Sequence, residues 1–171
     1  MSAPDRTLLL LRHAKSDYPD GVVDHERPLA PRGIRQAGLA GDWIRANVPE
    51  VGGVLCSTAT RTRQTLARTG LDVEDADIRY EDDLYDTTPG TVIRLVNGTD
   101  DGVETLLVVG HEPTMSTLAL GLSDPDVSDA EAAERISLKF PTSAIAVLRT
   151  SQPWHRLELH TAMLVAFHVP R

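Results

Sequence analysis

The sequence predicts an α/β fold, a three-layer α/β/α sandwich with a mixed, mostly parallel sheet. Three observations support this prediction. Strand-like and helix-like segments alternate along the chain, which is typical of helices layered on a sheet. The 171 residues are enough for one compact domain with a buried core. Aromatic residues make up only 4% of the chain, so Leu, Val, Ile and Ala must build most of that core.

The first third of the chain is expected to contain two strands and two helices. Residues 6–11 contain the apolar run TLLLL, which reads as a buried strand. Residues 31–47 follow a helical pattern, with a proline in the first turn and apolar residues on one face. A short apolar strand at 54–56 leads into a second helix at about 58–69, which Gly70 ends.

The same alternation continues to the C-terminus. A short strand at 78–80 is followed by the acidic loop 81–83. Hydrophobic patterns then predict two helices and three strands, namely helices at 89–97 and 113–121 and strands at 105–109, 144–149 and 157–165. The polar, acidic segment 123–135 is predicted to be a surface excursion.

Composition excludes several classes of protein. The net charge of -8, from 17 basic and 25 acidic residues, argues against nonspecific nucleic-acid binding, which needs clustered basic charge. No stretch reaches the roughly 18 apolar residues of a membrane span, and the N-terminus lacks a signal-peptide pattern. The lone Cys56 excludes an internal disulfide and is expected to be a small buried residue. We therefore expect a cytoplasmic protein without a membrane partner.

Polar side chains follow three predicted strands. The first strand ends at Arg12 and His13, the strand at 105–109 leads into His111, and Arg61 lies just past the strand at 54–56. Ligands of open α/β sheets bind at the carboxyl ends of the strands. Arginine is suited to phosphate oxygens because its guanidinium donates a fork of hydrogen bonds. These positions predict a phosphate-handling site.

Several segments together resemble the histidine phosphatase superfamily, whose fold is called phosphoglycerate mutase-like. The matching segments are Arg12-His13, Ser57…Arg61…Gln64-Thr65, Gly110-His111, Arg27-Pro28-Leu29 with Arg32-Gly33, and Thr142–Ala146. The finer match is to the short phosphohistidine phosphatases of the SixA type. The resemblance covers essentially the whole chain in the right order, which implies a single histidine phosphatase domain at 1–171.

The chemistry of phosphoryl transfer fits these residues. Arg12 and Arg61 can neutralise the phosphoryl oxygens. A neutral imidazole can attack phosphorus and form a phosphohistidine that water then hydrolyses. Cationic neighbours should hold the pKa of His13 down, so that the ring is unprotonated at neutral pH. The resemblance implies that His13 is the nucleophile and His111 its electrostatic partner. No metal or other cofactor is required.

A proton donor for the leaving group is less evident. Related mutases and broad phosphatases use an acidic residue, and the candidates here are Glu81, in the acidic loop, and Glu112, next to His111. A donor contributes less when the leaving group is imidazole, because imidazole is expelled far more easily than an alkoxide. Lys15 and Ser16 follow the nucleophile closely and are candidates for the rim of the phosphate pocket.

The favoured substrate is phosphohistidine on a signalling protein, such as a phosphotransfer domain. The alternative is a phosphatase of small phosphomonoesters that uses Glu81 or Glu112 as its acid. A mutase is less expected, because the chain is short and lacks an evident insertion that would close over a substrate. A non-catalytic module that binds phosphorylated ligands is a further alternative, although the presence of both His13 and His111 speaks against it.

Overall fold

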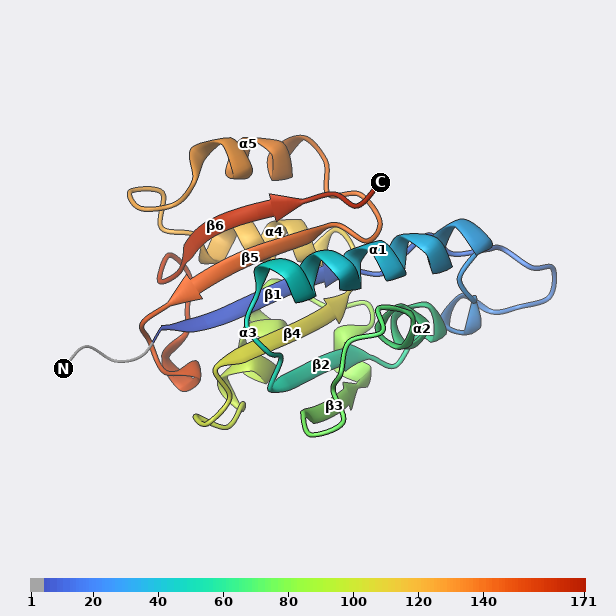
Figure 1. The fold of residues 1–171 in the computed structure, drawn as a ribbon, viewed down its shortest axis with the longest axis horizontal. Coiled ribbons are helices and arrows are strands. Elements are labelled where there is room, and N and C mark those ends of the chain that lie inside the picture. The colour runs from blue at the N-terminus through green and yellow to red at the C-terminus, as the bar shows by residue number, and fades with distance from the viewer. Residues whose placement is uncertain (1–4) are drawn as a thin grey trace.

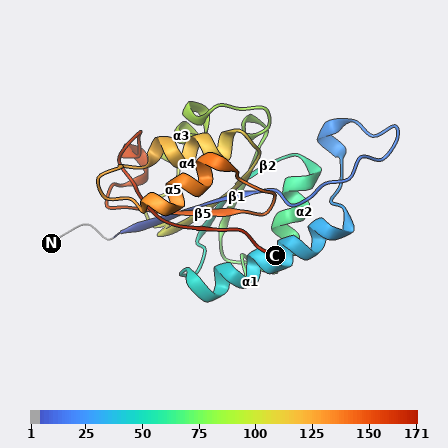
Figure 2. The ribbon, with the colours of Figure 1, turned by 90° about the horizontal axis from the view of Figure 1, so that it is seen from above.

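The computed structural model describes residues 5–171. Over that range, a six-stranded sheet lies between two layers of helices, as Figure 1 and Figure 2 show from two directions. This arrangement confirms the predicted three-layer α/β/α sandwich. The strands are β1 (Arg6–Arg12), β2 (Gly53–Ser57), β3 (Asp77–Glu81), β4 (Thr105–Gly110), β5 (Ile145–Thr150) and β6 (Met163–His168).

The sheet has the strand order β3-β2-β4-β1-β5-β6. Strands β3, β2, β4 and β1 pair in parallel, whereas β5 is antiparallel to both β1 and β6. Every residue of β4 and of the segment 7–11 in β1 is buried. Strands covered on both faces read as continuous apolar runs, which is why these two were evident from the sequence.

Helices cover both faces of the sheet (Figure 2). Helices α1 (Pro31–Asn47) and α2 (Thr60–Arg68) pack on one face, and the opposite face carries α3 (Pro89–Asn97), α4 (Thr114–Leu122) and α5 (Ala130–Leu138). Successive residues of β1 alternate between the two layers: Leu9 belongs to the core beneath α1, and Leu10 to the core beneath α4. In the described part of the chain no helix is both long and apolar enough to cross a membrane.

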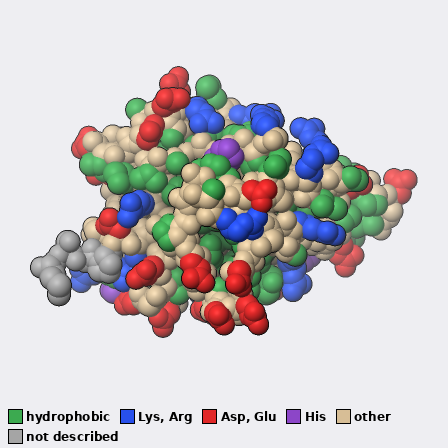
Figure 3. Space-filling view, in the orientation of Figure 1, with side chains coloured by type: hydrophobic (Ala, Val, Ile, Leu, Met, Phe, Trp, Pro, Cys, Tyr) green, Lys and Arg blue, Asp and Glu red, His purple; other side chains and the backbone are tan. Residues whose placement is uncertain are grey.

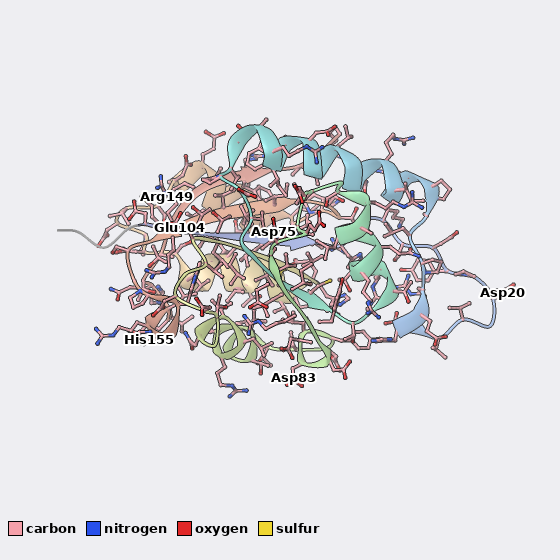
Figure 4. All side chains as sticks on the ribbon, turned by 60° about the horizontal axis from the view of Figure 1, so that its bottom comes forward. Asp20, Asp75, Asp83, Glu104, Arg149 and His155 are labelled. Atoms are coloured by element: carbon pink, nitrogen blue, oxygen red, sulfur yellow. The ribbon has the colours of Figure 1, made fainter. Side chains whose placement is uncertain are left out.

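Three short 3₁₀ helices complete the structure: η1 (Asp24–Glu26), η2 (Asp82–Leu84) and η3 (Trp154–Arg156). The first of them belongs to a long loop that extends beyond the carboxyl end of β1 in Figure 1. Figure 4 places Asp20 at the tip of this loop, whereas Glu104, just before β4, lies toward the opposite end of the molecule. The loop therefore stands on the same side of the molecule as the carboxyl ends of the parallel strands.

The segment predicted as a surface excursion, 123–135, is mostly exposed, but its second half belongs to helix α5, which was not predicted. Helix α5 begins after Asp129, whose side chain accepts a hydrogen bond from the Ala132 backbone N–H. The helix buries Ala132 and Ile136, which lie four residues apart on one face. The charged residues Glu134 and Arg135 between these two positions hid a weak helical pattern.

Other boundaries also differ from the predictions. The last strand begins at Met163 and not at residue 157, because the chain first packs the fully buried Trp154 of η3 against the core. Helix α2 begins at Thr60, two residues later than predicted. Glu81 is the last residue of β3 and not part of a loop, and the acidic residues after it form η2.

Helix α1 lies directly against the chain that follows β1. A Cβ atom at Gly33 would lie 2.0 Å from the carbonyl oxygen of Lys15, so only glycine fits there. The same carbonyl accepts a hydrogen bond of 2.9 Å from the Ala30 N–H at the start of α1. This contact fixes the backbone two residues after His13.

Candidate active site

The carboxyl ends of β1, β4 and β2 bring the candidate residues together. Arg12 pairs with Gly110 in the parallel register of β1 and β4, so His13 and His111 occupy the next position on neighbouring strands. The His13 N–H donates to the Gly110 carbonyl at 3.0 Å. The two imidazole rings are 5.3 Å apart between centroids. The pairing of two strands distant in sequence thus creates this histidine pair.

The orientation of the His13 ring is fixed by a backbone carbonyl. His13 Nδ1 lies 2.7 Å from the carbonyl oxygen of Ala14. A carbonyl only accepts hydrogen bonds, so Nδ1 carries the proton and Nε2 of the neutral ring keeps its lone pair. The Ala14 N–H in turn donates to Thr65 Oγ1 at 2.9 Å, which anchors this peptide to α2. Nε2 has no hydrogen-bond partner among residues 5–171.

The surroundings keep His13 neutral. Burial lowers the pKa of His13 to about 3, and the nearby His111, Arg61 and Arg12 act in the same direction. The bond to the Ala14 carbonyl favours the protonated ring and opposes part of this shift. The side chain is 8% exposed, so it is nearly removed from water. At neutral pH the ring is therefore a neutral imidazole.

His111 is held by the end of β2. Its Nε2 lies 2.8 Å from Ser57 Oγ, and that oxygen accepts a hydrogen bond of 3.3 Å from the Ala59 N–H. The Ser57 hydroxyl can donate its proton to Nε2, and in that tautomer of His111 the ring proton is on Nδ1. Burial lowers the pKa of His111 to about 4, and the positive charge of Arg61 contributes.

Arg61, in the first turn of α2, is buried and clamped by Asp24 of η1. Its Nη1 donates to the Asp24 carbonyl at 2.8 Å, and its Nη2 donates to Asp24 Oδ2 at 3.1 Å. The same carboxylate accepts hydrogen bonds from the Tyr85 hydroxyl and from Arg27 Nε. These bonds, that from Tyr85 foremost, hold the pKa of Asp24 well below its usual range.

The clamp was not foreseen from the sequence. Asp24 and Tyr85 lie in loops, with no hydrophobic period to place them near α2. The one signal in the sequence was that Arg27-Pro28-Leu29, in this loop, is among the segments that resemble the superfamily. Tyr85 also contacts His111, with ring centroids 5.5 Å apart, and so forms one wall beside the histidines.

Three buried side-chain nitrogens around the histidines have no partner in the described part of the chain. They are Arg12 Nε, Arg61 Nε and His111 Nδ1. The remainder of the Arg12 guanidinium is oriented by a bond of 2.8 Å from Nη1 to the Phe140 carbonyl. Buried polar groups are nearly always paired, so these unpartnered nitrogens, two of which are arginine donors, indicate a site for an anion that accepts hydrogen bonds.

The other predicted site residues are placed differently. The hydroxyl of Ser16 accepts a hydrogen bond of 2.8 Å from Arg27 Nη1, so it braces the loop after β1. Glu112 caps the start of α4: its carboxylate accepts hydrogen bonds from the backbone N–H and the hydroxyl of Ser116, at 2.7 and 2.8 Å. Glu81 pairs with Ser57 in the register of β2 and β3. Lys15 is exposed and lines a cavity next to Arg12.

A second cavity has the wrong charge to bind an anion. A cavity of about 350 Å³ at the opposite edge of the sheet is lined by the acidic residues Glu50, Asp72, Asp75 and Glu104, which would repel an anion. Figure 4 shows Asp75 and Glu104 away from the tip of the loop marked by Asp20.

Cys56 is fully buried, and burial raises the pKa of its thiol to about 12, so it stays protonated. Within residues 5–171, no three His, Cys, Asp or Glu side chains are grouped to hold a metal ion.

Comparison with known proteins identifies the class of protein that this fold and site define. The family model "Histidine phosphatase superfamily (branch 1)" matches residues 8–97. A protein of Mycobacterium tuberculosis strain H37Rv, itself uncharacterized, is 63% identical over 94% of this chain and all of its own length. The chain therefore belongs to the histidine phosphatase superfamily. It is a phosphatase, that is, an enzyme and not the non-catalytic binding module considered from the sequence.

Within the superfamily, the similar proteins include SixA phosphatases. A structure from Nakamurella multipartitia described as a phosphohistidine phosphatase SixA has a TM-score of 0.89 and 38% identity, and covers 99% of both chains. The phosphohistidine phosphatase SixA of Escherichia coli is 27% identical over 81% of this chain and 82% of its own. A phosphoglycerate mutase of Plasmodium falciparum, 18% identical with a TM-score of 0.62 over 98% of this chain and 94% of that one, shares the fold. The predicted phosphoglycerate mutase-like fold and SixA resemblance are confirmed.

Proposed function

We propose that this enzyme hydrolyses phosphohistidine on a protein, through a phosphohistidine intermediate on His13. One observation carries the proposal: the Ala14 carbonyl holds the proton of His13 on Nδ1, which leaves Nε2 as a nucleophile beside the unpartnered Nε donors of Arg12 and Arg61. An imidazole lone pair next to an anion-binding cluster is the arrangement that in-line attack on phosphorus needs.

In the first step, the lone pair of His13 Nε2 attacks phosphorus while the bond from phosphorus to the substrate nitrogen breaks. The leaving imidazole, which carries a proton on its other ring nitrogen, takes the electrons of that bond and departs as a neutral ring. Arg12, Arg61 and His111 Nδ1–H donate hydrogen bonds to the phosphoryl oxygens, whose negative charge is partly neutralised in the transition state. These donors are already oriented by the protein, so little reorganisation is needed when the reaction occurs.

In the second step, water attacks the phosphoryl group on His13. The bond between Nε2 and phosphorus breaks, its electrons return to Nε2, and the proton lost by water goes to the phosphate product or to solvent. Because Nδ1 keeps its proton on the Ala14 carbonyl throughout, His13 departs as a neutral imidazole and not as an anion. The same hydrogen bond therefore assists both attack and release.

The absence of an engaged proton donor favours a phosphohistidine substrate. Both carboxylate oxygens of Glu112 already accept hydrogen bonds from Ser116. Glu81 pairs through its backbone with Ser57, the residue that contacts His111, but its side chain makes no hydrogen bond to another side chain in the described range. A neutral imidazole leaves without a dedicated acid, whereas an alkoxide requires one. A phosphotransfer domain of a signalling protein is the partner that this chemistry suits.

A second candidate is the hydrolysis of small phosphomonoesters. Glu112 lies close enough to Arg12 to raise the pKa of that guanidinium against the effect of burial, so a carboxylate does stand near the site. In this case Glu112 or Glu81 would protonate the leaving alkoxide. Turnover of alkyl phosphates that collapses in Glu112→Gln or Glu81→Gln would support this candidate.

The decisive experiment compares the two substrates. Phosphate release is measured from a phosphohistidine-bearing phosphotransfer protein and from a panel of alkyl phosphates, with the native enzyme and with His13→Ala. We expect rapid, His13-dependent release from phosphohistidine, poor turnover of the esters, and a rapidly quenched phosphoenzyme whose label is lost in acid. Efficient ester hydrolysis with phosphohistidine untouched would overturn the proposal.

A further inference from the structure

A second cationic region adjoins the candidate active site. A cavity of about 230 Å³ lies between the start of α1, the loop before β5 and the C-terminal residues. We call it the basic pocket and define it by its five cationic lining residues, Arg12, Lys15, Arg32, Lys139 and Arg171. No acidic side chain lines it. Figure 3 shows Lys and Arg side chains over the first half of α1 and near the C-terminus.

Four of the five charges of the basic pocket have no acidic partner, and only Arg12 is near a carboxylate, that of Glu112. Of the twelve arginines outside the pocket, five pair with aspartates, in Arg6–Asp101, Arg27–Asp24, Arg45–Asp42, Arg61–Asp24 and Arg149–Asp5, and the other seven have no ion-pair partner among residues 5–171. The side chains of Lys15, Arg32, Lys139 and Arg171 also have no ion-pair partner among residues 5–171, and these four line the same cavity. Like charges brought together without a counter-charge repel each other, so a bound anion would stabilise this arrangement.

Neutral groups in the basic pocket also point to an anion. Gln36 Oε1 accepts hydrogen bonds of 3.1 Å from the Lys15 N–H and from the Thr142 hydroxyl. The amide nitrogen of Gln36 is therefore left to donate to a ligand. The start of α1 has no side-chain cap and no acidic residue in its first turn, so the positive end of its dipole is not neutralised there.

The basic pocket is continuous with the reaction centre through Arg12. Arg12 lines the pocket, precedes His13 in the chain, and is close enough to lower the pKa of both histidines. Neither histidine lines the pocket, so it is a neighbouring space and not the phosphoryl position itself. A group bound there would belong to the part of the substrate next to the phosphorylated residue.

We propose that the basic pocket binds the carboxylate of an acidic residue that flanks the phosphohistidine in the substrate protein. This inference rests on the proposed function and adds a rule of selectivity to it. The enzyme carries a net charge of -8, so an acidic partner is repelled by most of its surface. Five of its 17 basic residues converge on this one pocket, which can orient such a partner with its phosphoryl group toward His13.

The test uses two chemically phosphorylated histidine peptides that differ only at the flanking positions, which are glutamate in one and glutamine in the other. kcat and KM are measured at low ionic strength for the native enzyme and for Arg32→Gln/Lys139→Gln. We expect the native enzyme to prefer the acidic peptide about tenfold in kcat/KM, mainly through KM. In the double variant this preference should fall to about twofold or less, while turnover of the glutamine peptide is unchanged.

A matched control separates local binding from general electrostatics. Arg68→Gln/Arg156→Gln removes the same two charges from exposed positions outside the pocket, and it should keep the preference. Equal kcat/KM for the two peptides with the native enzyme would overturn the proposal. So would a preference that the pocket variant retains, or one that the control loses equally. If neither peptide is dephosphorylated, the proposed function itself fails, which is a distinct result.

Discussion

Asp24 binds both terminal nitrogens of Arg61, one through its backbone carbonyl at 2.8 Å and the other through its carboxylate at 3.1 Å. The arginine thus has two of its hydrogen-bonding positions fixed by one residue, and its unpartnered Nε is held in a defined direction. This makes Asp24 a positioning residue for Arg61. An exposed loop is in this way connected to a buried cation of the candidate active site.

Removing the charge of Asp24 should loosen Arg61. Asp24→Asn retains the backbone carbonyl but weakens the bonds from Arg61 Nη2 and Arg27, so we expect kcat/KM to fall about tenfold because the cation is less well oriented. Asp20→Asn is the matched control, since Asp20 lies at the tip of the same loop and the charge change is identical (Figure 4). Steady-state kinetics that show equal losses in the two variants would contradict the positioning role.

The two active-site histidines should remain neutral in mildly acidic solution. Burial lowers the pKa of His13 to about 3 and that of His111 to about 4, so both rings stay unprotonated at pH 5. A free histidine would be mostly protonated at that pH. NMR titration of the ring resonances is the measurement, with His13→Asn used for assignment. Resonances of either ring that shift with a midpoint near 6.5 would refute the expectation.

The lowered pKa values of His13 and His111 also make the stability of the protein depend on pH. The unfolded chain binds a proton on each ring near pH 6.5, whereas the native rings do so only near pH 3 and 4. Stability from the neutral rings is therefore complete above pH 6.5 and is lost as the pH falls through this window. Between pH 6 and 5, each ring should lower the free energy of unfolding by about 1 kcal/mol.

Urea unfolding of the native protein and of His13→Asn at these two pH values tests this linkage. The variant lacks one of the two rings, so its free energy of unfolding should decrease less on acidification, by about 1 kcal/mol. The comparison is made within each protein, so any constant effect of the substitution cancels. Identical decreases in the two proteins would show that His13 does not contribute to the pH dependence.

Replacing either of two glycines of α1 with alanine should change the free energy of unfolding, but in opposite directions. In Gly33→Ala, the new Cβ would meet the Lys15 carbonyl at 2.0 Å, so α1 or the segment after His13 must move. We expect a loss of about 2 kcal/mol or more in the free energy of unfolding, together with lower activity. Gly38→Ala meets only the Arg68 carbonyl at 3.9 Å, an ordinary contact, and should stabilise the helix by about 0.5–1 kcal/mol. Denaturation curves in which both variants are more stable than the native protein, or both less stable, would contradict the steric account.

Much of the fold could be predicted because the central strands are buried on both faces. The runs before His13 and His111 are continuous and apolar, so both the strands and the polar residues at their ends were evident. Arg61 was found in the same way, from its position just after β2. Helix α5 escaped detection because its buried face is narrow and its exposed face is acidic.

The sequence did not reveal the contacts that hold the candidate residues in place. The contact between Asp24 and Arg61 joins positions 37 residues apart, and the one between Tyr85 and Asp24 joins positions 61 apart. Such contacts depend on how loops fold over the sheet, and loops carry no periodic pattern. The basic pocket is similar, because its cationic residues come from four separate segments of the chain. Only the three-dimensional arrangement brings them to one place.

The position of β1 in the sheet has a consequence for synthesis of the protein. β1 is the first strand to leave the ribosome, yet its neighbours are β4 and β5, from the second half of the chain. Until residues 105–110 and 145–150 emerge, both edges of this leucine-rich strand stay unpaired. The nascent chain therefore presents a transient, aggregation-prone segment that a holdase chaperone could shield. The strand that delivers His13 must wait for most of the polypeptide before it can enter the sheet.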